Sequence, residues 1–304
     1  MKTYQLALIA LCANFCANAQ SIVPLPFGDF NTWTTREVKE SSIIGGKTKT
    51  LYDIGLDNSP WATSNVVAKV AGVTKCSNAV FCDTIDGTDR CVKMTTILDE
   101  VKALGIINMK VLVSGTIFLG EMIQPVTSTK NPYSKMNMGI PFNKRPTHLI
   151  FDYKVSVPTD NKIIYSDGFG SPKQRQGSDK AEILIILQRR WEDENGNLHA
   201  MRVGTGRERF STSTDWKRQH HLPILYGDIT SHPDYKPYMT LLCNDKAYYA
   251  RNSQGKMVPI EEEGWDNINS TPTHLLIMAS SGCGTPYTGT IGMTFWLDNI
   301  ALRY

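Results

Sequence analysis

The sequence has no strong excess of charge of either sign. Its 304 residues include 32 Lys and Arg against 29 Asp and Glu, a formal net charge of +3. A dedicated nucleic-acid-binding protein carries a clustered basic excess, so nucleic acid is not an expected partner. Glycine (23) and proline (15) are present in ordinary numbers and 41% of the residues are hydrophobic, which excludes a fibrous, low-complexity or disordered chain.

Long apolar runs are missing as well. The run from Leu6 to Ala13 has about eight residues, well below the roughly 20 that span a bilayer. It follows Lys2 and precedes a small-x-small end, a pattern typical of a secretory signal peptide cleaved after Ala19. We therefore expect residues 1–19 to be removed and residues 20–304 to form a single exported domain without a membrane span. The protein would then be periplasmic, at the cell surface or secreted.

Cysteine is scarce, with seven in the chain, and two of these lie in the predicted signal peptide. Five remain: Cys76, Cys82, Cys91, Cys243 and Cys283. In an oxidising compartment the first expectation is disulfides. We expect a local bridge among the first three and a long-range bridge between Cys243 and Cys283, with at least one thiol left over. The spacings match no common zinc pattern.

Helical periodicity is rare, and residues 99–108 form the best short helix candidate. Strand patterns are frequent. Residues 145–157 alternate between apolar and polar, as in a strand with one face in a core and one in water. Residues 181–191 are continuously apolar over most of their length, which predicts a central strand covered on both faces. These patterns predict an all-β fold, an antiparallel β-sandwich of jelly-roll type with long connecting loops and little helix.

The last strand pattern changes phase. Apolar residues stand at odd positions from Ile291 to Leu297 and at even positions from Ile300 to Tyr304. A slip of one residue in a period of two is the signature of a β-bulge, here at Asp298 and Asn299. A bulge there would re-aim the carboxylate of Asp298, although Asp298 could also simply end one edge of the strand.

No short motif pairs a general acid with a base. Glycoside hydrolysis needs two carboxylates that face one cleft. Carboxylates in or next to strand-like stretches are Glu121, Asp152, Glu182, Glu192 and Asp298. The sequence alone does not say which of them meet, so it favours binding over catalysis.

Aromatic side chains offer a second route to a function, because exposed rings stack on the faces of sugars. Trp33 and Trp61 both stand in polar, turn-rich surroundings. Either ring could instead belong to the core, where large aromatic side chains are mostly found.

Six short motifs follow one another along the chain. They are Phe27-Gly-Asp-Phe30-Asn-Thr-Trp33, Pro60-Trp61-Ala-Thr63-Ser-Asn65, Ser114-Gly115-Thr-Ile-Phe-Leu-Gly120, Gly139-Ile-Pro-Phe142-Asn-Lys-Arg145-Pro146, Ser280-Ser281-Gly-Cys-Gly284-Thr-Pro-Tyr287-Thr-Gly289 and Leu297-Asp298-Asn-Ile300-Ala-Leu302. In this order they resemble the putative carbohydrate metabolism domain family of exported proteins from gut-type bacteria. The resemblance covers nearly the whole chain after residue 19. It implies a jelly-roll β-sandwich similar to carbohydrate-binding modules and some glycan-active lyases and hydrolases, and an association with glycans, without naming a reaction.

Together with the aromatic argument, the resemblance points to particular residues. Candidate glycan contacts are Trp33, Trp61, Asn65, Arg145 and Tyr287. Asp298 matches the family, and in carbohydrate-binding jelly rolls an acid near that point often belongs to a structural calcium site with residues of the first strand. Asp29 and Asn31 are the matching candidates for such a calcium site.

Three functions therefore stay open. The first hypothesis is an exported, non-catalytic glycan-binding module whose partner is an oligo- or polysaccharide. The second is a glycoside hydrolase or polysaccharide lyase on the same fold, which requires a cleft with two carboxylates about 5–10 Å apart. The third is an adhesin or structural surface subunit without sugar specificity. The sequence does not identify a protein partner.

Overall fold

The computed structural model describes residues 21–70, 72–103 and 107–304. The predicted signal peptide, residues 1–19, lies outside the described residues. Helical structure within the described ranges is limited to four short 3₁₀ turns, η1 (Ser42–Ile44), η2 (Pro132–Lys135), η3 (Pro237–Met239) and η4 (Asn244–Lys246). None of the described helical segments is long and apolar enough to cross a membrane. The expectation of an all-β fold with little helix is confirmed.

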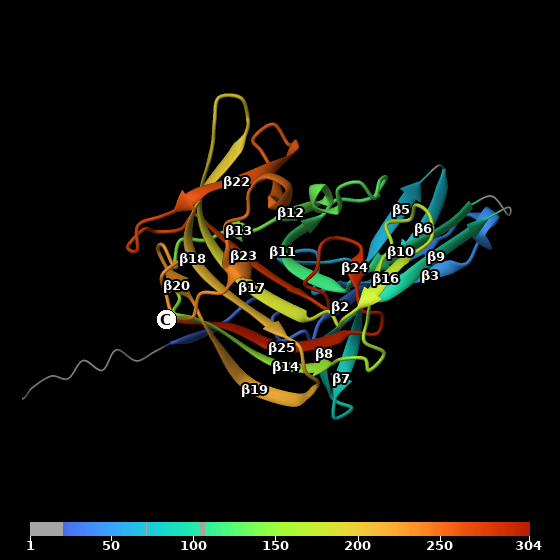
Figure 1. Ribbon diagram of the computed structural model, residues 1–304, viewed down its shortest axis with the longest axis horizontal. Coiled ribbons are helices and arrows are strands. Elements are labelled where there is room, and N and C mark those ends of the chain that lie inside the picture. Colours follow the sequence, from blue (N-terminus) through green and yellow to red (C-terminus); the bar gives the residue numbers. More distant parts are fainter. Residues whose placement is uncertain (1–20, 71, 104–106) are drawn as a thin grey trace, which may run out of the picture.

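One layer is a six-stranded sheet in the order β19-β14-β25-β8-β7, with β1 paired to β25 (Figure 1). Its strands are β1 (Ile22–Pro24), β7 (Val80–Ile85), β8 (Asp89–Thr95), β14 (His148–Ser156), β19 (Thr214–Pro223) and β25 (Thr294–Arg303). Every pairing in this sheet is antiparallel. The predicted alternating strand at residues 145–157 is β14, whose Leu149 and Phe151 point into the core while Lys154 and Ser156 contact water to differing degrees.

The second layer closes on itself. Seven strands follow one another in the order β23-β17-β18-β22-β21-β12-β11, and β11 pairs back onto β23. They are β11 (Thr116–Met122), β12 (Met136–Met138), β17 (Ala181–Glu192), β18 (Leu198–Phe210), β21 (Tyr248–Arg251), β22 (Met257–Trp265) and β23 (His274–Ser280). Three short strands pair onto this ring, namely β4 (Trp61–Thr63), β13 (Ile140–Pro141) and β20 (Leu225–Tyr226).

The jelly-roll sandwich predicted from the sequence is therefore wrong. The second layer is a closed seven-stranded barrel that contains two parallel pairings, β12 with β21 and β18 with β22. Alternation along a strand reports which of its faces is buried, and it carries no information on which strand lies beside it. The closure depends on β11, which pairs with both β12 and β23, and no local pattern marks that double pairing.

Two cores follow from this architecture. The larger one lies between the six-stranded sheet and the outer wall of the barrel, and Ile183, Ile185 and Leu187 of β17 enter it. The smaller core fills the barrel and receives Leu184 and Ile186 from the opposite face of the same strand. The expectation that residues 181–191 form a central strand covered on both faces is confirmed for its apolar part.

Further hairpins flank the barrel on one side (Figure 1). Their strands are β2 (Trp33–Lys39) with β3 (Thr48–Ile54), β5 (Val66–Val70) with β6 (Val73–Ser77), and β9 (Ile97–Ala103) with β10 (Ile107–Val113). A small sheet joins β15 (Lys162–Tyr165), β16 (Lys173–Gln176) and β24 (Thr288–Gly289). The helix predicted for residues 99–108 is wrong, because residues 99–103 belong to β9 and residues 107–108 to β10, and these two strands pair with Val101 opposite Met109. Residues 104–106 within it lie outside the described ranges.

The predicted β-bulge in the last strand is confirmed. Asp152 pairs with Asp298 and Ile150 pairs with Ala301, so two residues of β25, Asn299 and Ile300, face Phe151 alone. Asn299 has a φ of 53°, in the left-handed region that asparagine tolerates better than most residues.

The predicted disulfides are not formed. All five cysteines of the described residues are unpaired: Cys76, Cys82, Cys91, Cys243 and Cys283. Cys82 and Cys91 come from the paired strands β7 and β8, but Cys82 is opposite Val92 and Cys91 is opposite Asp83. Spacing in the sequence shows which cysteines are near in the chain, whereas bridge formation depends on how their Cβ atoms face each other.

We expect substitutions on either face of β17 to destabilise the protein strongly. Ile183→Ala would open a cavity between the layers and Leu184→Ala one inside the barrel, each lowering the free energy of unfolding by about 2–5 kcal/mol in urea denaturation. Gln174→Ala on exposed β16 is the control and should stay within about 0.5 kcal/mol of the wild type. A Leu184→Ala variant as stable as the control would contradict a filled barrel.

Candidate functional site

The barrel has a cavity at each end. Strand β17 runs along the wall, and its barrel-facing positions extend from Glu182 at one end to Arg190 at the other. A cavity of about 360 Å³ lies at the Glu182 end, and a second one of about 290 Å³ lies at the Arg190 end. The apolar side chains of the barrel core lie between them. The larger cavity is within the size range of small-molecule sites, about 300–1,000 Å³, and the smaller one is at its lower limit.

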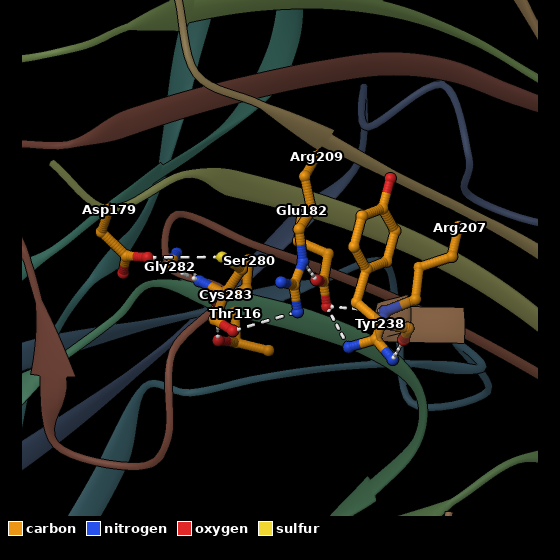
Figure 2. A network of polar contacts seen from close by, with 9 residues as sticks. All are labelled: Thr116, Asp179, Glu182, Arg207, Arg209, Tyr238, Ser280, Gly282 and Cys283. Carbon is orange, nitrogen blue, oxygen red and sulfur yellow. Dashed lines mark hydrogen bonds and ion pairs between the residues drawn. The ribbon is translucent and has the colours of Figure 1, made fainter. Parts of the chain in front are cut away.

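A buried ion cluster borders the larger cavity (Figure 2). The side chain of Glu182 is 2% exposed and lies between two guanidinium groups. Arg207 donates to Oε1 of Glu182 from Nη2 at 2.6 Å and from Nε at 3.1 Å. Arg209 donates from Nε to the other oxygen, Oε2. The cluster therefore combines one anion with two cations.

The register of two strands creates this cluster. Glu182 of β17 lies directly opposite Arg209 of β18, and Arg207 stands two residues earlier on the same face. The guanidinium groups are anchored further, because Arg207 donates to the carbonyl oxygen of Tyr238 at 2.6 Å and Arg209 lies 4.4 Å from the centre of the Tyr238 ring. A pair of basic residues two apart in a strand, with an acid in the neighbouring strand, is too common in sequences to mark such a site.

The walls of the larger cavity differ in character. The flanking hairpins supply aliphatic side chains, among them Val66, Val73, Val101, Val111 and Val113. The barrel side supplies hydroxyl groups, and those of Thr116 and Ser280 are 2.8 Å apart. Tyr133 and Tyr248 also border the cavity, and burial raises the pKa of both phenols, so each keeps its proton at neutral pH. An apolar wall thus faces a set of fixed hydrogen-bonding groups.

An aromatic group lies beside the mouth of this cavity. Phe169 is 69% exposed and Tyr165 is 39% exposed. The hydroxyl of Tyr165 donates to Asp167 at 2.9 Å, and Asp167 also accepts the backbone N–H of Phe169 at 3.0 Å. The backbone of Ser166 donates to the carbonyl oxygen of Tyr287, which joins this loop to the cavity wall. Sequence reasoning missed Tyr165 and Phe169, although an aromatic residue between Gly168 and Gly170 in a polar turn is a usable signal of exposure.

The structure places Trp61 and Asn65 inside the fold. Trp61 is 5% exposed, and its indole N–H donates to the carbonyl oxygen of Pro26 at 2.9 Å. Asn65 is fully buried and bonds to backbone groups of Tyr52, Ala79 and Val80. Trp61 therefore offers no ring face to a ligand, and Asn65 ties neighbouring segments together. Burial in the core was the alternative to a glycan contact for Trp61, and the polar, turn-rich residues around it in the chain gave no sign of that burial.

The other three predicted contacts lie in different places. Trp33 is half-buried against the larger core and donates to the carbonyl oxygen of Phe30 at 2.7 Å. Arg145 donates to the carbonyl oxygens of Ile268 and Ser270 and lies 4.1 Å from the centre of the Tyr226 ring, so it holds a loop. Tyr287 is the one residue of the predicted five, all of them within the described ranges, that lines the larger cavity.

The predicted calcium ligands have other contacts. The amide oxygen of Asn31 accepts the backbone N–H of Arg90 at 3.2 Å, and Arg90 donates a second bond to the carbonyl oxygen of Asn31. Asp29 accepts the backbone N–H of Asn31 at 3.4 Å. Across the described residues no group of three or more His, Cys, Asp and Glu side chains is arranged to hold a metal ion. A calcium site stays a prediction.

Asp298 is 1% exposed, and the amide N–H of Asn299 reaches its Oδ2 at 2.8 Å and Oδ2 of Asp152 at 3.1 Å. The other oxygen of Asp298, Oδ1, is buried without a partner among the described residues. Burial raises the pKa of Asp298 to about 7, and the nearby carboxylates of Asp89 and Asp152 add to the rise. Asp152 itself is held by Arg218 at 3.0 Å.

Comparison with known proteins identifies the class. Residues 29–303 match the putative carbohydrate metabolism domain, and the chain belongs to this family. No curated protein sequence matches the chain. The resemblance expected from the six motifs is confirmed, and a role related to carbohydrate metabolism follows from it.

Two solved structures are similar to this chain. A putative glycoside hydrolase from Bacteroides thetaiotaomicron VPI-5482 shares 18% identity with a TM-score of 0.48, over 90% of this chain and 72% of that chain. A putative glycoside hydrolase from Bacteroides vulgatus ATCC 8482 shares 14% identity with a TM-score of 0.49, over 90% of this chain and 96% of that chain.

We expect Glu182→Gln to lower the free energy of unfolding by about 3 kcal/mol or more, because it removes the buried anion that two partly buried guanidinium groups share. Urea denaturation measures the loss. Glu121→Gln removes the exposed partner of Arg251 and should cost less than about 1 kcal/mol. Equal losses in the two variants would show that the Glu182 cluster is no more important to stability than a surface ion pair.

The raised pKa of Asp298 makes its stability effect depend on pH. The folded state binds the proton more tightly than the unfolded state, so the free energy of unfolding falls as pH rises from about 4 through about 7. Asp298→Asn cannot ionise, so it removes this fall in the free energy of unfolding. Its amide oxygen still accepts the hydrogen bond from the side-chain N–H of Asn299. The gain in stability of the variant over the wild type should grow by about 2–3 kcal/mol between pH 5 and pH 8.5 in urea denaturation. The exposed Asp160→Asn should show no such trend, and a pH-independent difference for Asp298→Asn would refute the assignment.

Proposed function

We propose that the protein is an exported glycan-binding protein that holds a saccharide in the larger cavity without cleaving it. The observation that carries the proposal is the division of that cavity into an aliphatic wall and a polar wall with Thr116, Ser280 and the Glu182 cluster. A sugar ring has an apolar face and a rim of hydroxyl groups, and such a cavity provides a surface for each. Membership in a carbohydrate-related family supports the same ligand class.

The aromatic group at the mouth supports a chain longer than one sugar. Tyr165 and Phe169 expose ring surface outside the cavity, and Tyr287 belongs to the cavity wall itself. Exposed rings of this kind stack on sugar faces at little entropic cost, because an aromatic side chain has only two rotatable angles. A saccharide seated in the cavity would extend its next unit over these rings.

The carboxylates at the cavity favour binding over hydrolysis. Among the described residues that line it, the acids are Glu182 and Asp99. Glu182 is bound by two arginines, and Asp99 lies 3.4 Å from the ammonium of Lys75. A glycosidase needs one carboxyl group that delivers a proton and a second one that acts as nucleophile or base. Both acids here are committed to ion pairs.

Export is part of the proposal and rests on the sequence of residues 1–19, which has the charge, apolar run and small-residue end of a secretory signal. An exported protein with a saccharide site would meet its ligand outside the cytoplasm. Sequencing the N terminus of the protein recovered from its native host tests this part, with Gln20 expected as the first residue.

Filling the cavity tests the binding function. Ala68 of β5 lines the cavity, whereas the neighbouring Lys69 is exposed on the opposite face of the strand. After a glycan array has identified a ligand, we expect Ala68→Trp to weaken its binding by about tenfold or more in calorimetry, a loss of about 1.4 kcal/mol. Lys69→Trp adds the same ring elsewhere and should bind like the wild type.

The outcomes separate the alternatives. Equal binding by the two variants would remove the site from this cavity. Absence of any ligand on a broad array would favour an adhesin or structural subunit. New reducing ends after incubation of the ligand with the wild-type protein would show that the protein hydrolyses the ligand and does not merely bind it.

A further inference from the structure

The cavity at the opposite end of the barrel has a different character. Its volume is about 290 Å³, and its walls include Asn137, Gly139, Arg190, Trp191, Arg251 and His274. These residues come from β12, β17, β21 and β23 and from the turn after β12, so the cavity is the second open end of the barrel. It contains fewer aliphatic groups and more nitrogen donors than the first cavity.

Arg190 is the central group of this cavity. Its Nε donates to Oε1 of Gln188 at 2.7 Å and its Nη1 donates to the carbonyl oxygen of Met138 at 3.0 Å. Its Nη2 is buried and has no hydrogen-bond partner among the described residues. A Cβ atom at Gly139 would lie only 2.7 Å from this nitrogen, so a glycine there leaves room for it.

No carboxylate neutralises Arg190. Within the described ranges, no acidic side chain lies within the 4.0 Å of an ion pair from its guanidinium. Glu262 contributes to its field, but that carboxylate is held by Arg202, Gln188 and the backbone N–H of Leu242. Burial lowers the pKa of Arg190 to about 9, so the group is still a cation at neutral pH. A buried charge without a counter-ion is costly, and a bound anion would remove that cost.

Over the described residues, the cavity lining contains one carboxylate, Glu192, whose oxygens accept the backbone N–H and the hydroxyl of Ser253 at 2.8 and 2.7 Å. The basic groups beside Arg190 suit an anion that is attached to a sugar. Arg251 adds a second cation at the rim, and its ion pair with Glu121, at 3.3 Å, is on the surface. Burial and the charge of Arg190 lower the pKa of His274 to about 4, so its ring is neutral and can donate a hydrogen bond. Trp191 is on the outer face of β17, where its ring is stacked on His199 at 5.5 Å and lies 5.9 Å from the guanidinium of Arg189, so it does not face Arg190.

We propose that this second end of the barrel is a binding site for an acidic saccharide, with the guanidinium of Arg190 receiving its carboxylate or sulfate group and the ring of His274 donating a hydrogen bond to its sugar. Arginine fits both groups because its planar donors match two oxygens at once. The site is about eight residues of β17 away from the larger cavity, or roughly 27 Å at 3.3–3.4 Å per residue, and it does not require a ligand there.

Calorimetry with small acidic and neutral sugars tests the site. We expect glucuronate to bind the wild-type protein at least about tenfold more tightly than glucose. Arg190→Gln should abolish this preference, whereas Arg175→Gln, on the exposed strand β16, should keep it. Galactose 6-sulfate and free sulfate distinguish a carboxylate site from a sulfate site, and tight binding of either sulfated sugar or glucuronate supports the proposal.

A second variant keeps the proposal testable if Arg190→Gln does not fold. Arg251→Gln changes an exposed side chain, and we expect it to weaken binding of the acidic sugar about threefold or more even if Arg190→Gln cannot be purified. The proposal is overturned if Arg190→Gln or Arg251→Gln binds the acidic sugar as tightly as the wild type does. It is also overturned if the wild type binds glucuronate, the sulfated sugar and glucose with equal affinity. Because Ala68→Trp blocks only the larger cavity, it should leave this binding unchanged, so failure here and failure of the proposed function can be told apart.

Discussion

The double pairing of β11 closes the barrel, and most other features depend on this closure. Because β11 pairs with β23 at Thr116–Phe118 and with β12 at Gly120–Met122, the two ends of the row of strands are joined and the barrel wall has no free edge between them. A closed ring of seven strands encloses a narrow lumen that side chains fill, from Phe118 of β11 to Ile260 of β22. The outer wall is then available to pack against the six-stranded sheet. Only the two ends of the lumen are left for cavities.

The two ends resolve the same physical problem in different ways. A charged side chain that faces into a barrel is removed from much of its water and needs a partner. At one end Glu182 obtains two arginines, and the cluster is complete within the protein. At the other end Glu262 pairs with Arg202 and Gln188, while Arg190 is left without an anion. This difference is the reason for assigning an acidic saccharide to the second cavity.

Local patterns predicted what depends on neighbours in the chain. The phase change around Asp298 and Asn299 predicted the bulge, because alternation must slip where an extra residue is inserted. The apolar run of β17 predicted a strand buried on both faces. The same reasoning failed for residues 99–108, where a few apolar spacings favoured a helix but the residues pair as the β9–β10 hairpin. Trp61 and Asn65 have polar neighbours in the chain, and only the packing of distant segments shows that both are buried.

The sequence by itself determined the all-β character of the fold, the family, the main strands and the position of the bulge, because each of these is recorded in the order of neighbouring residues. The tertiary structure decided the closure of the barrel, the unpaired state of the cysteines and the composition of both cavities. Glu182 meets Arg207 and Arg209 through strand register, and Arg190 lacks an anion because Glu262 bonds elsewhere. Such contacts depend on which strands become neighbours in space, and the alternation along each single strand contains no record of that choice.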